Sequence, residues 1–334
     1  MIPASPPGSS MARESADWLQ RSGLGALRLA GRNLLPIVQG GMGIGISGNR
    51  LAGSVAALGG VGTLSSVDLR RHHPDLMEQT RDLAPGEAAK AGINAANLVA
   101  IDREIHAARE RTGGRGLLAI NVMRAVSEYA ANVTRALEAG IDAVVVGAGL
   151  PLDLPDLAKD HPKAALIPIL SDARGVQLLV KKWERKKRLP DAVVIEHPRL
   201  AGGHLGAARI GDLGDTRFDF ENVLPAVRQF FKDAGYEQHI PLIAAGGISS
   251  CEDIARLQAL GADAVQLGTA FAVTEESDAH AEFKRVLAQA RPEDMVEFTS
   301  VAGLPARAVG TPWLRAYLKI EPKLQAVAQV KARC

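Results

Sequence analysis

Two consecutive apolar runs late in the chain end in residues that could hold a phosphate group. Gly246 and Gly247 follow the first run, and Gly268 and Thr269 follow the second. Glycine lets phosphate oxygens approach backbone N–H groups, and a helix that begins just after the turn adds a favourable dipole. The alternative is that these glycines only form tight turns. Their occurrence on two successive predicted strands favours a phosphate site.

A second glycine-rich stretch, from Gln39 through Gly40, Gly41 and Met42, follows the first apolar run of the chain. These positions carry little side chain, so a flat ring can lie against the backbone. The backbone N–H groups are then available to heteroatoms of the ring. The alternative is a turn that only leads the chain into the next helix.

Asn121 lies near the end of an apolar run at 117–122. A buried amide must be hydrogen-bonded, and this side chain can both donate and accept, as a pyrimidine-like edge requires. An Asn bonded only to neighbouring backbone is an equally open interpretation.

His204 follows Gly202 and Gly203 in a glycine-rich loop at the end of another apolar run. Imidazole has an ordinary pKa of about 6.5, which suits a general base. The other seven histidines fall in predicted helices, in ordinary loops or beside proline. His204 is therefore the candidate catalytic residue.

The elements that must position these residues are short apolar runs that alternate with helical patterns. Each run is aliphatic or β-branched, as expected of strands buried on both faces. The predicted strands are Leu35–Gln39, Val61–Leu64, Leu117–Val122, Ala143–Val146, Ala165–Ile169, Ala192–Glu196, Leu242–Ala245 and Ala264–Leu267. The predicted helices between them are Asn49–Leu58, Ala88–Arg111, Ser127–Ala139, Gly175–Lys187, Phe220–Ala234 and Cys251–Leu260. This alternation favours an α/β fold, the (β/α)8 TIM barrel.

A doubly wound parallel sheet is the main alternative to the barrel. It usually carries a G-x-G-x-x-G turn between its first strand and first helix. Gly43, Gly45 and Gly48 match that spacing, but all of them precede Asn49, where the helix is predicted to begin. A lone match of this kind is weak support for a dinucleotide site.

The chain organisation follows from the same patterns. Residues 1–25 are predicted to be a loose N-terminal arm, and residues 26–334 to form the barrel. The barrel carries an inserted segment at about 73–112 and a helical C-terminal extension at about 275–334. Long loops are predicted at 73–87 and 199–218, and long loops inside compact domains are often functional.

Composition narrows the classes of function. The net charge of +2, from 39 basic and 37 acidic residues, gives no reason to expect a nucleic-acid or anionic-membrane partner. No apolar stretch is long enough to span a bilayer. The two cysteines, Cys251 and Cys334, form no metal-binding or disulfide pattern, so no metal is predicted and a reducing cytoplasm fits best. A homo-oligomer is left open.

Taken together, these motifs resemble the nitronate monooxygenase family, formerly called 2-nitropropane dioxygenases, whose superfamily includes a flavin-dependent enoyl-acyl-carrier-protein reductase and NADH:quinone reductases. The resemblance runs from about residue 36 to residue 271. Its most specific elements are Gln39-Gly-Gly-Met-Gly43, Ala201-Gly-Gly-His-Leu-Gly206, Ala244-Ala-Gly-Gly-Ile248 and Gln266-Leu-Gly-Thr269.

The resemblance implies an FMN-containing TIM barrel and assigns the site residues by position. The flavin ring would face Gly40, Gly41 and Met42, and Asn121 would form a hydrogen bond with it. His204 matches the histidine assigned as catalytic base in the family. The remaining implied cofactor contacts are Gly202 and Gly203 beside the ring, Gly246, Gly247, Gly268 and Thr269 at the phosphate, and Gln266 close by.

One departure from the family pattern affects the sixth strand. Many members carry Gln-Gly-x-Glu-Ala-Gly-Gly-His there, whereas this chain reads Glu196-His-Pro-Arg-Leu-Ala-Gly-Gly-His204. Leu200 replaces the Glu before Ala. The Gln position falls on His197 or, with a shift of one residue, on Glu196, which we take as the cofactor contact.

The resemblance implies oxidation of a small alkyl nitronate or nitroalkane by O2, giving a carbonyl compound and nitrite, with His204 as base. The alternative enzyme is an NAD(P)H-dependent FMN reductase of a quinone or an enoyl thioester. Two further alternatives are a flavin-binding accessory barrel without chemistry of its own and a phosphate-binding barrel without flavin.

Overall fold

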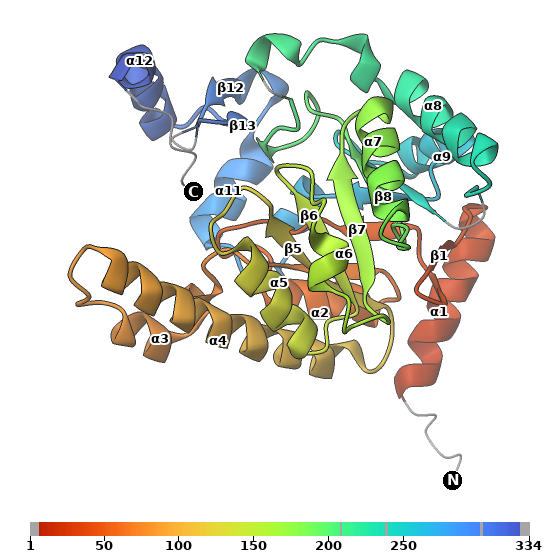
Figure 1. The fold of residues 1–334 in the computed structure, drawn as a ribbon, viewed down its shortest axis with the longest axis horizontal. Coiled ribbons are helices and arrows are strands. Elements are labelled where there is room, and N and C mark those ends of the chain that lie inside the picture. The colour runs from red at the N-terminus through yellow and green to blue at the C-terminus, as the bar shows by residue number, and fades with distance from the viewer. Residues whose placement is uncertain (1–6, 208, 238–239, 301–302, 328–334) are drawn as a thin grey trace.

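The computed structural model describes residues 7–207, 209–237, 240–300 and 303–327, and its centre is a closed barrel of eight parallel strands (Figure 1). The barrel order is β10-β11-β3-β4-β5-β6-β7-β8. The bounds are β3 Ile37–Gln39, β4 Val61–Ser65, β5 Leu117–Met123, β6 Ala143–Gly147, β7 Ala165–Leu170, β8 Val193–Glu196, β10 Leu242–Ala245 and β11 Ala264–Leu267. The TIM-barrel prediction is therefore confirmed, and each predicted strand overlaps an observed one.

Helices cover the outside of the barrel. Their bounds are α2 Asn49–Ala57, α4 Glu87–Thr112, α5 Tyr129–Glu138, α6 Leu154–Leu157, α7 Ala173–Glu184, α8 Phe220–Asp233, α9 Cys251–Ala259 and α10 Thr269–Ala272. Local chemistry sets several ends. Ser250 and Asp253 form a capping box at the start of α9, and Gly140 takes a φ of 77° just after α5, where glycine is favoured.

Two apolar layers explain why the strands read as continuous hydrophobic runs. Alternate strand residues point to opposite faces, so one set lines the barrel and the other packs under the helices. Val38, Ala119 and Val194 belong to the barrel-lining set, whereas Ile120 and Ile195 belong to the layer under the helices. The lining is rich in Ala and Val, which matches the low aromatic content.

The N-terminal arm is more ordered than the sequence suggested. Residues 7–22 of the expected loose arm form α1, Pro7–Ser22, and the Ser15 hydroxyl donates to the carbonyl of Leu58 at 2.7 Å. An antiparallel hairpin follows, made of β1 Leu27–Leu29 and β2 Arg32–Leu34. Its leucines are buried with the barrel lining, so the hairpin closes the N-terminal end of the barrel.

The expected inserted segment and C-terminal extension also contain elements that periodicity did not indicate. The first holds α3 Pro74–Gln79 ahead of α4, so the loop expected at 73–87 is partly helical, and η1 Leu69–His72 lies just before it. The extension holds α11 Ala281–Gln289, η4 Pro292–Asp294, β12 Met295–Thr299, β13 Pro305–Val309 and α12 Pro312–Val327. The extension is therefore not purely helical, because β12 and β13 form a hairpin.

This hairpin joins a small third sheet. β13 pairs antiparallel with β9, Gly203–His204, in the loop after β8. Two short turns, η2 Ile210–Asp212 and η3 Thr216–Phe218, complete that loop before α8. The C-terminal extension therefore packs beside the loop that carries the predicted catalytic histidine.

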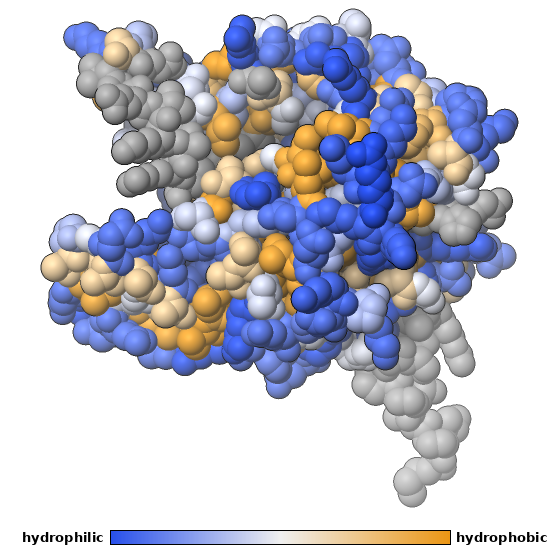
Figure 2. All heavy atoms as spheres, viewed as in Figure 1, coloured by the Kyte–Doolittle hydropathy of each residue, from blue (hydrophilic) through white to orange (hydrophobic). Residues whose placement is uncertain are grey.

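The face in Figure 2 is mainly hydrophilic, with hydrophobic residues in patches between the polar ones. Mixed exposure of this kind is ordinary for a folded domain. Among the described residues, every helix is too short or too polar to cross a lipid bilayer.

Candidate functional site

A layer of polar side chains lies at the C-terminal end of the barrel. At the ends of five of the eight strands, β4, β5, β7, β8 and β11, a polar residue takes the last inward position after apolar barrel-lining residues. Ala119 is followed two residues later by Asn121, Val194 by Glu196, and Ala264 by Gln266. The five members are Ser65, Asn121, Ser171, Glu196 and Gln266, which we call the polar layer.

Three members of the polar layer, Asn121, Glu196 and Gln266, are predicted site residues. Ser65 and Ser171 were missed by sequence reasoning, because an isolated Ser at a strand end carries no motif. They can be found from the alternation of inward and outward side chains along a strand, because Ser171 continues the inward series of Ala165, Ile167 and Ile169 on β7. TIM-barrel active sites form at this end of the strands.

The glycine-rich loop after β3 lies directly against the polar layer. A Cβ placed on Gly41 would be 2.3 Å from Cβ of Asn121, and one on Gly40 would be 3.4 Å from Cγ of Gln266. Met42 Sδ lies 3.6 Å from the point where a Cβ on Gly268 would be. The structure thus brings together predicted residues from three separate strand ends, those of β3, β5 and β11.

Hydrogen bonds fix this loop and change one expectation about it. Met42 donates its backbone N–H to Ser47 Oγ at 2.9 Å, and Gly40 donates its N–H to the carbonyl of Leu267 at 2.9 Å. Buried Gln39 donates to Ser47 Oγ at 2.9 Å and accepts from the Thr63 N–H at 2.8 Å. The N–H groups of residues 40 and 42 are therefore occupied, and the expectation that they are available to a ring is wrong.

The two predicted phosphate turns are neighbours. β10 pairs with β11 in a register that sets Ala245 beside Gln266, so the following turns begin side by side. Gly246 and Gly247 have φ angles of 112° and 70°, which side chains rarely adopt. A Cβ on Gly247 would be 3.1 Å from Cβ of Leu200, so the loop after β8 packs against this turn.

The segment with the predicted base is held by the C-terminal hairpin. Gly203 pairs with Arg307 and His204 with Ala306, while the imidazole of His204 lies outside the described part of the structure. A Cβ on Gly202 or on Gly203 would meet no described atom within 4 Å. The backbone here is open, and its position depends on a strand that sequence reasoning did not find.

Successive side chains of β8 point to opposite faces, and this distinguishes His197 from Glu196 as the residue at the family's Gln position. His197 points outward to the helix layer, where its ring meets Phe220 edge-on at 5.4 Å and its Nε2 lies 3.4 Å from Asp219 Oδ1. Burial lowers the pKa of His197. Glu196 has the inward phase of Ala192 and Val194, which favours it as the residue that faces a ligand.

Glu196 lies beside Ser171 and Gly206. A Cβ on Gly206 would be 2.1 Å from Ser171 Oγ and 3.8 Å from Glu196 Oε2, so the chain just after His204 returns to the polar layer. Burial raises the pKa of the Glu196 carboxyl to about 7. The site therefore holds a carboxyl group that changes its charge near neutral pH.

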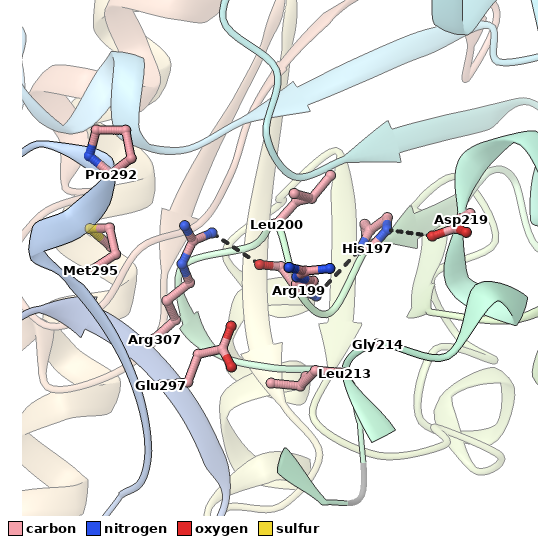
Figure 3. Close-up of a pocket in the computed structure, with 10 residues that line it drawn as sticks. All are labelled: His197, Arg199, Leu200, Leu213, Gly214, Asp219, Pro292, Met295, Glu297 and Arg307. Atoms are coloured by element: carbon pink, nitrogen blue, oxygen red, sulfur yellow. Dashed lines mark hydrogen bonds and ion pairs between the residues drawn. The ribbon is translucent and has the colours of Figure 1, made fainter. Parts of the chain in front are cut away.

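A cavity of about 660 Å³ lies on the other side of the loop after β8 (Figure 3). Its walls are this loop and the β12–β13 hairpin, with Arg199 and Arg307 between them, and Arg307 Nη1 donates to the carbonyl of Arg199 at 3.0 Å. Leu200 separates the cavity from the turn at Gly247. No member of the polar layer lines it, so this cavity is a neighbour of the predicted cofactor site.

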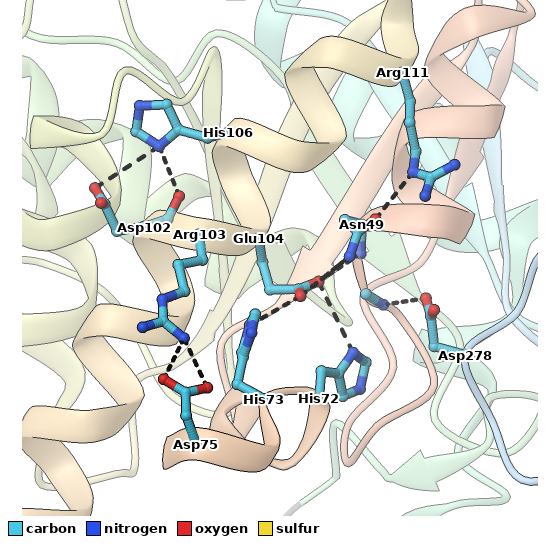
Figure 4. A network of polar contacts seen from close by, with 11 residues as sticks. Asn49, His72, His73, Asp75, Asp102, Arg103, Glu104, His106, Arg111 and Asp278 are labelled. Carbon is cyan, nitrogen blue, oxygen red and sulfur yellow. Dashed lines mark hydrogen bonds and ion pairs between the residues drawn. The ribbon is translucent and has the colours of Figure 1, made fainter.

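A buried carboxylate anchors the far end of the glycine-rich loop (Figure 4). Glu104 of α4 accepts from the Asn49 backbone N–H at 2.7 Å and lies 3.1 Å from His73 Nε2. Gly48 donates its N–H to Asp278 at 3.0 Å, and burial raises the pKa of Asp278. These contacts tie the loop to α4 and to the C-terminal extension. The described residues contain no cluster that could hold a metal ion.

A family model described as nitronate monooxygenase matches residues 32–333. The chain is 28% identical over 284 residues to a probable nitronate monooxygenase of Bacillus subtilis (strain 168), a match that covers 84% of this chain and 77% of that protein.

Two solved structures share the fold. FabK from Thermotoga maritima aligns with a TM-score of 0.64 at 24% identity, covering 87% of this chain and 76% of that one. Nitroalkane oxidase from Streptomyces ansochromogenes aligns with a TM-score of 0.62 at 24% identity, covering 91% and 81%. At these identities the structural likeness concerns the fold.

Proposed function

This chain belongs to the nitronate monooxygenase family and is an oxidoreductase, and from that premise we propose that it oxidises alkyl nitronates, or the nitroalkanes from which they form, with O2 and FMN. The products are a carbonyl compound and nitrite. FMN, when bound, supplies the redox chemistry, and the protein orients the substrate and tunes its electrostatics.

The observation that carries this proposal is the polar layer beneath the glycine-rich loop. The side-chain amides of Asn121 and Gln266 make no hydrogen bond with any other described residue. Amides can donate and accept, as the heteroatoms of a flavin ring require. Gly40 and Gly41 keep side chains away from the same space. These residues fit a flat polar ring lying across the barrel end.

The neighbouring turns after β10 and β11 fit the phosphate end of FMN. Gly246, Gly247 and Gly268 leave backbone unshielded by side chains, and Thr269 adds a hydroxyl group. Their place after the seventh and eighth barrel strands is the usual phosphate position in TIM barrels. Glu196, Gly202 and Gly203 complete the set of residues that we assign to the cofactor.

His204 is assigned as the base. Its imidazole takes the proton from the carbon that bears the nitro group of a neutral nitroalkane, which leaves the nitronate anion. A nitronate supplied as the anion needs no such step. Removal of a positioned base typically slows proton transfer by about 10²–10⁴-fold.

The test is His204→Asn, compared on two substrates. Turnover of neutral nitroalkane should fall by about 10²-fold or more, while turnover of preformed nitronate and the FMN content stay close to wild type. His197→Asn is the matched control, because the Asn oxygen can still accept the Arg199 N–H that His197 Nδ1 accepts now at 3.2 Å. Unchanged nitroalkane turnover in the His204 variant would refute the base assignment.

Anaerobic rapid mixing distinguishes the proposed nitronate oxidation from the alternative, an NAD(P)H-dependent FMN reductase. We expect the flavin absorbance to bleach with nitronate and to persist with NADH or NADPH. Rapid bleaching by a nicotinamide cofactor, with none by nitronate, would favour the reductase. Purified protein without a yellow chromophore, and with no affinity for added FMN, would contradict every flavin function.

A further inference from the structure

Glu196 is the one carboxyl group in the polar layer. It ends β8 and shares the inward phase of Ala192 and Val194, so its side chain points to the space where the proposed substrate and flavin ring lie. The other four members of the layer are uncharged. Any change in the charge of this layer near neutral pH therefore comes from Glu196.

The groups around Glu196 offer its carboxylate no compensating charge. Ala245 of β10 is its register partner, and Ser171 follows the β7 residue that pairs with Ile195. Gly206 lies in front of it. Among the described residues no hydrogen bond and no ion pair reaches the Glu196 carboxyl group.

Two histidines are the titratable neighbours along the chain. His197 points to the opposite face and is occupied by Asp219. His204 lies two residues before Gly206 in the loop after β8, and its imidazole lies outside the described part of the structure. Removing the proton from Glu196 thus places an uncompensated negative charge beside the substrate space.

A protonated carboxyl group and a carboxylate treat an anion in opposite ways. The protonated form can donate its O–H to an anionic oxygen, whereas the carboxylate can only accept and repels an anion. The retained proton follows from burial, which raises the pKa of this group to about 7. A nitronate carries its negative charge on two oxygens, so it needs a donor.

We propose that Glu196 is the substrate-recognition residue for the nitronate anion, donating a hydrogen bond from its protonated carboxyl group to a nitronate oxygen and excluding the anion once that proton is lost. This inference rests on the proposed function; to the cofactor contact assigned there to Glu196 it adds a contact with the substrate, and with it the form of the substrate that the site accepts. The carboxyl group makes anion binding in this chain dependent on pH.

The test compares the pH dependence of kcat/KM for preformed nitronate in the wild-type, Glu196→Gln and Ser171→Ala holoenzymes. With wild-type enzyme, kcat/KM should fall about tenfold per pH unit above about pH 7. Glu196→Gln should remove this decline, because the amide keeps a donor in place. Ser171→Ala should keep it, because that change removes a neighbour without removing the titrating group. A decline of equal size in Glu196→Gln, or none in wild type, would overturn the proposal.

Two further readouts separate this inference from the proposed function. Inorganic nitrite alone, followed by the change it causes in flavin absorbance, should bind more weakly above about pH 7 in wild type and equally at all pH values in Glu196→Gln. Carbon NMR of glutamate-labelled, flavin-free protein should show one carboxyl titrating near pH 7 that is missing from Glu196→Gln. If nitronate does not reduce the flavin, the function fails while both measurements still decide the role of Glu196. A Glu196 titration at the ordinary value for Glu would overturn the inference itself.

Discussion

Replacing Gly41 by Ala tests the closest contact in the site. The new Cβ would lie 2.3 Å from Cβ of Asn121 and 3.2 Å from the carbonyl of Leu64. Both atoms are fixed to strand backbone and cannot rotate away, so β3 and β5 must move apart. Overpacking of this kind costs about 1–3 kcal/mol, and we expect a loss of about 2 kcal/mol in the free energy of unfolding.

Gly40→Ala is the matched control, one residue away. Its Cβ would lie 3.4 Å from Gln266 Cγ and 3.4 Å from the carbonyl of Leu267, which is ordinary van der Waals contact. The free energy of unfolding should change by less than about 0.5 kcal/mol, while the added methyl group narrows the space over the polar layer and weakens FMN binding.

Urea unfolding of the flavin-free proteins, followed by circular dichroism, measures the two changes side by side. An FMN titration of each variant then separates stability from binding. Equal stability of Gly41→Ala and wild type, or a larger loss in Gly40→Ala, would refute the packing of the glycine-rich loop on Asn121.

Three other predictions concern charge and polar contacts. Because burial raises the folded-state pKa of Glu196 to about 7, the folded protein keeps a proton that the unfolded chain loses. Up to about 3 kcal/mol of the free energy of unfolding, present below about pH 4.5, is therefore lost as the pH rises to about 7. A pH series of urea midpoints for wild type and Glu196→Gln should show this loss in wild type alone. Asn121→Leu should weaken FMN binding about tenfold at unchanged stability, as one lost hydrogen bond implies, and equal affinity by fluorescence titration would count against the amide contact. Glu104→Ala should lower the free energy of unfolding by about 2–4 kcal/mol, because the Asn49 N–H and His73 lose their carboxylate partner. It should also speed hydrogen exchange in residues 42–48, and unchanged exchange would show that Glu104 does not hold the loop.

The barrel was predictable because its strands are buried on both faces. Ala143–Gly147 and Ala165–Leu170 are continuous runs of apolar residues and glycine for this reason, and glycine, proline or polar residues mark the ends of such runs. Close backbone contacts also leave a sequence signal. A Cβ on Gly62 would lie 1.8 Å from the carbonyl of Ala52, so a glycine is required where α2 crosses β4.

The site was predictable where several residues act together and less so where one residue acts alone. Motifs point to Gly40, Gly41 and Gly268, whereas Ser171 is found only by following the inward phase of β7. The assignment of Glu196 over His197 likewise needs the phase of β8, because a shift of one residue exchanges the two faces.

Long-range pairing accounts for most of what the sequence did not indicate. β9 has two residues and pairs with β13 about a hundred residues later, so neither strand has a local pattern that identifies its partner. The N-terminal hairpin also lacks a local pattern that predicts it, because Leu27 and Leu34 are buried by packing against the barrel-lining residues. Such contacts depend on tertiary packing, which overrides local propensity.

The most direct test of a flavin on the polar layer is anaerobic mixing of the FMN-loaded protein with a preformed alkyl nitronate, followed by admission of O2. We expect the visible flavin absorbance to bleach with nitronate and to return with O2, with nitrite and the carbonyl compound formed in equal amounts. Gly40→Ala, which keeps the fold and narrows this space, should show weaker flavin loading and proportionally less bleaching. An unchanged spectrum in a fully loaded protein, or product formed equally well without flavin, would contradict the proposed function.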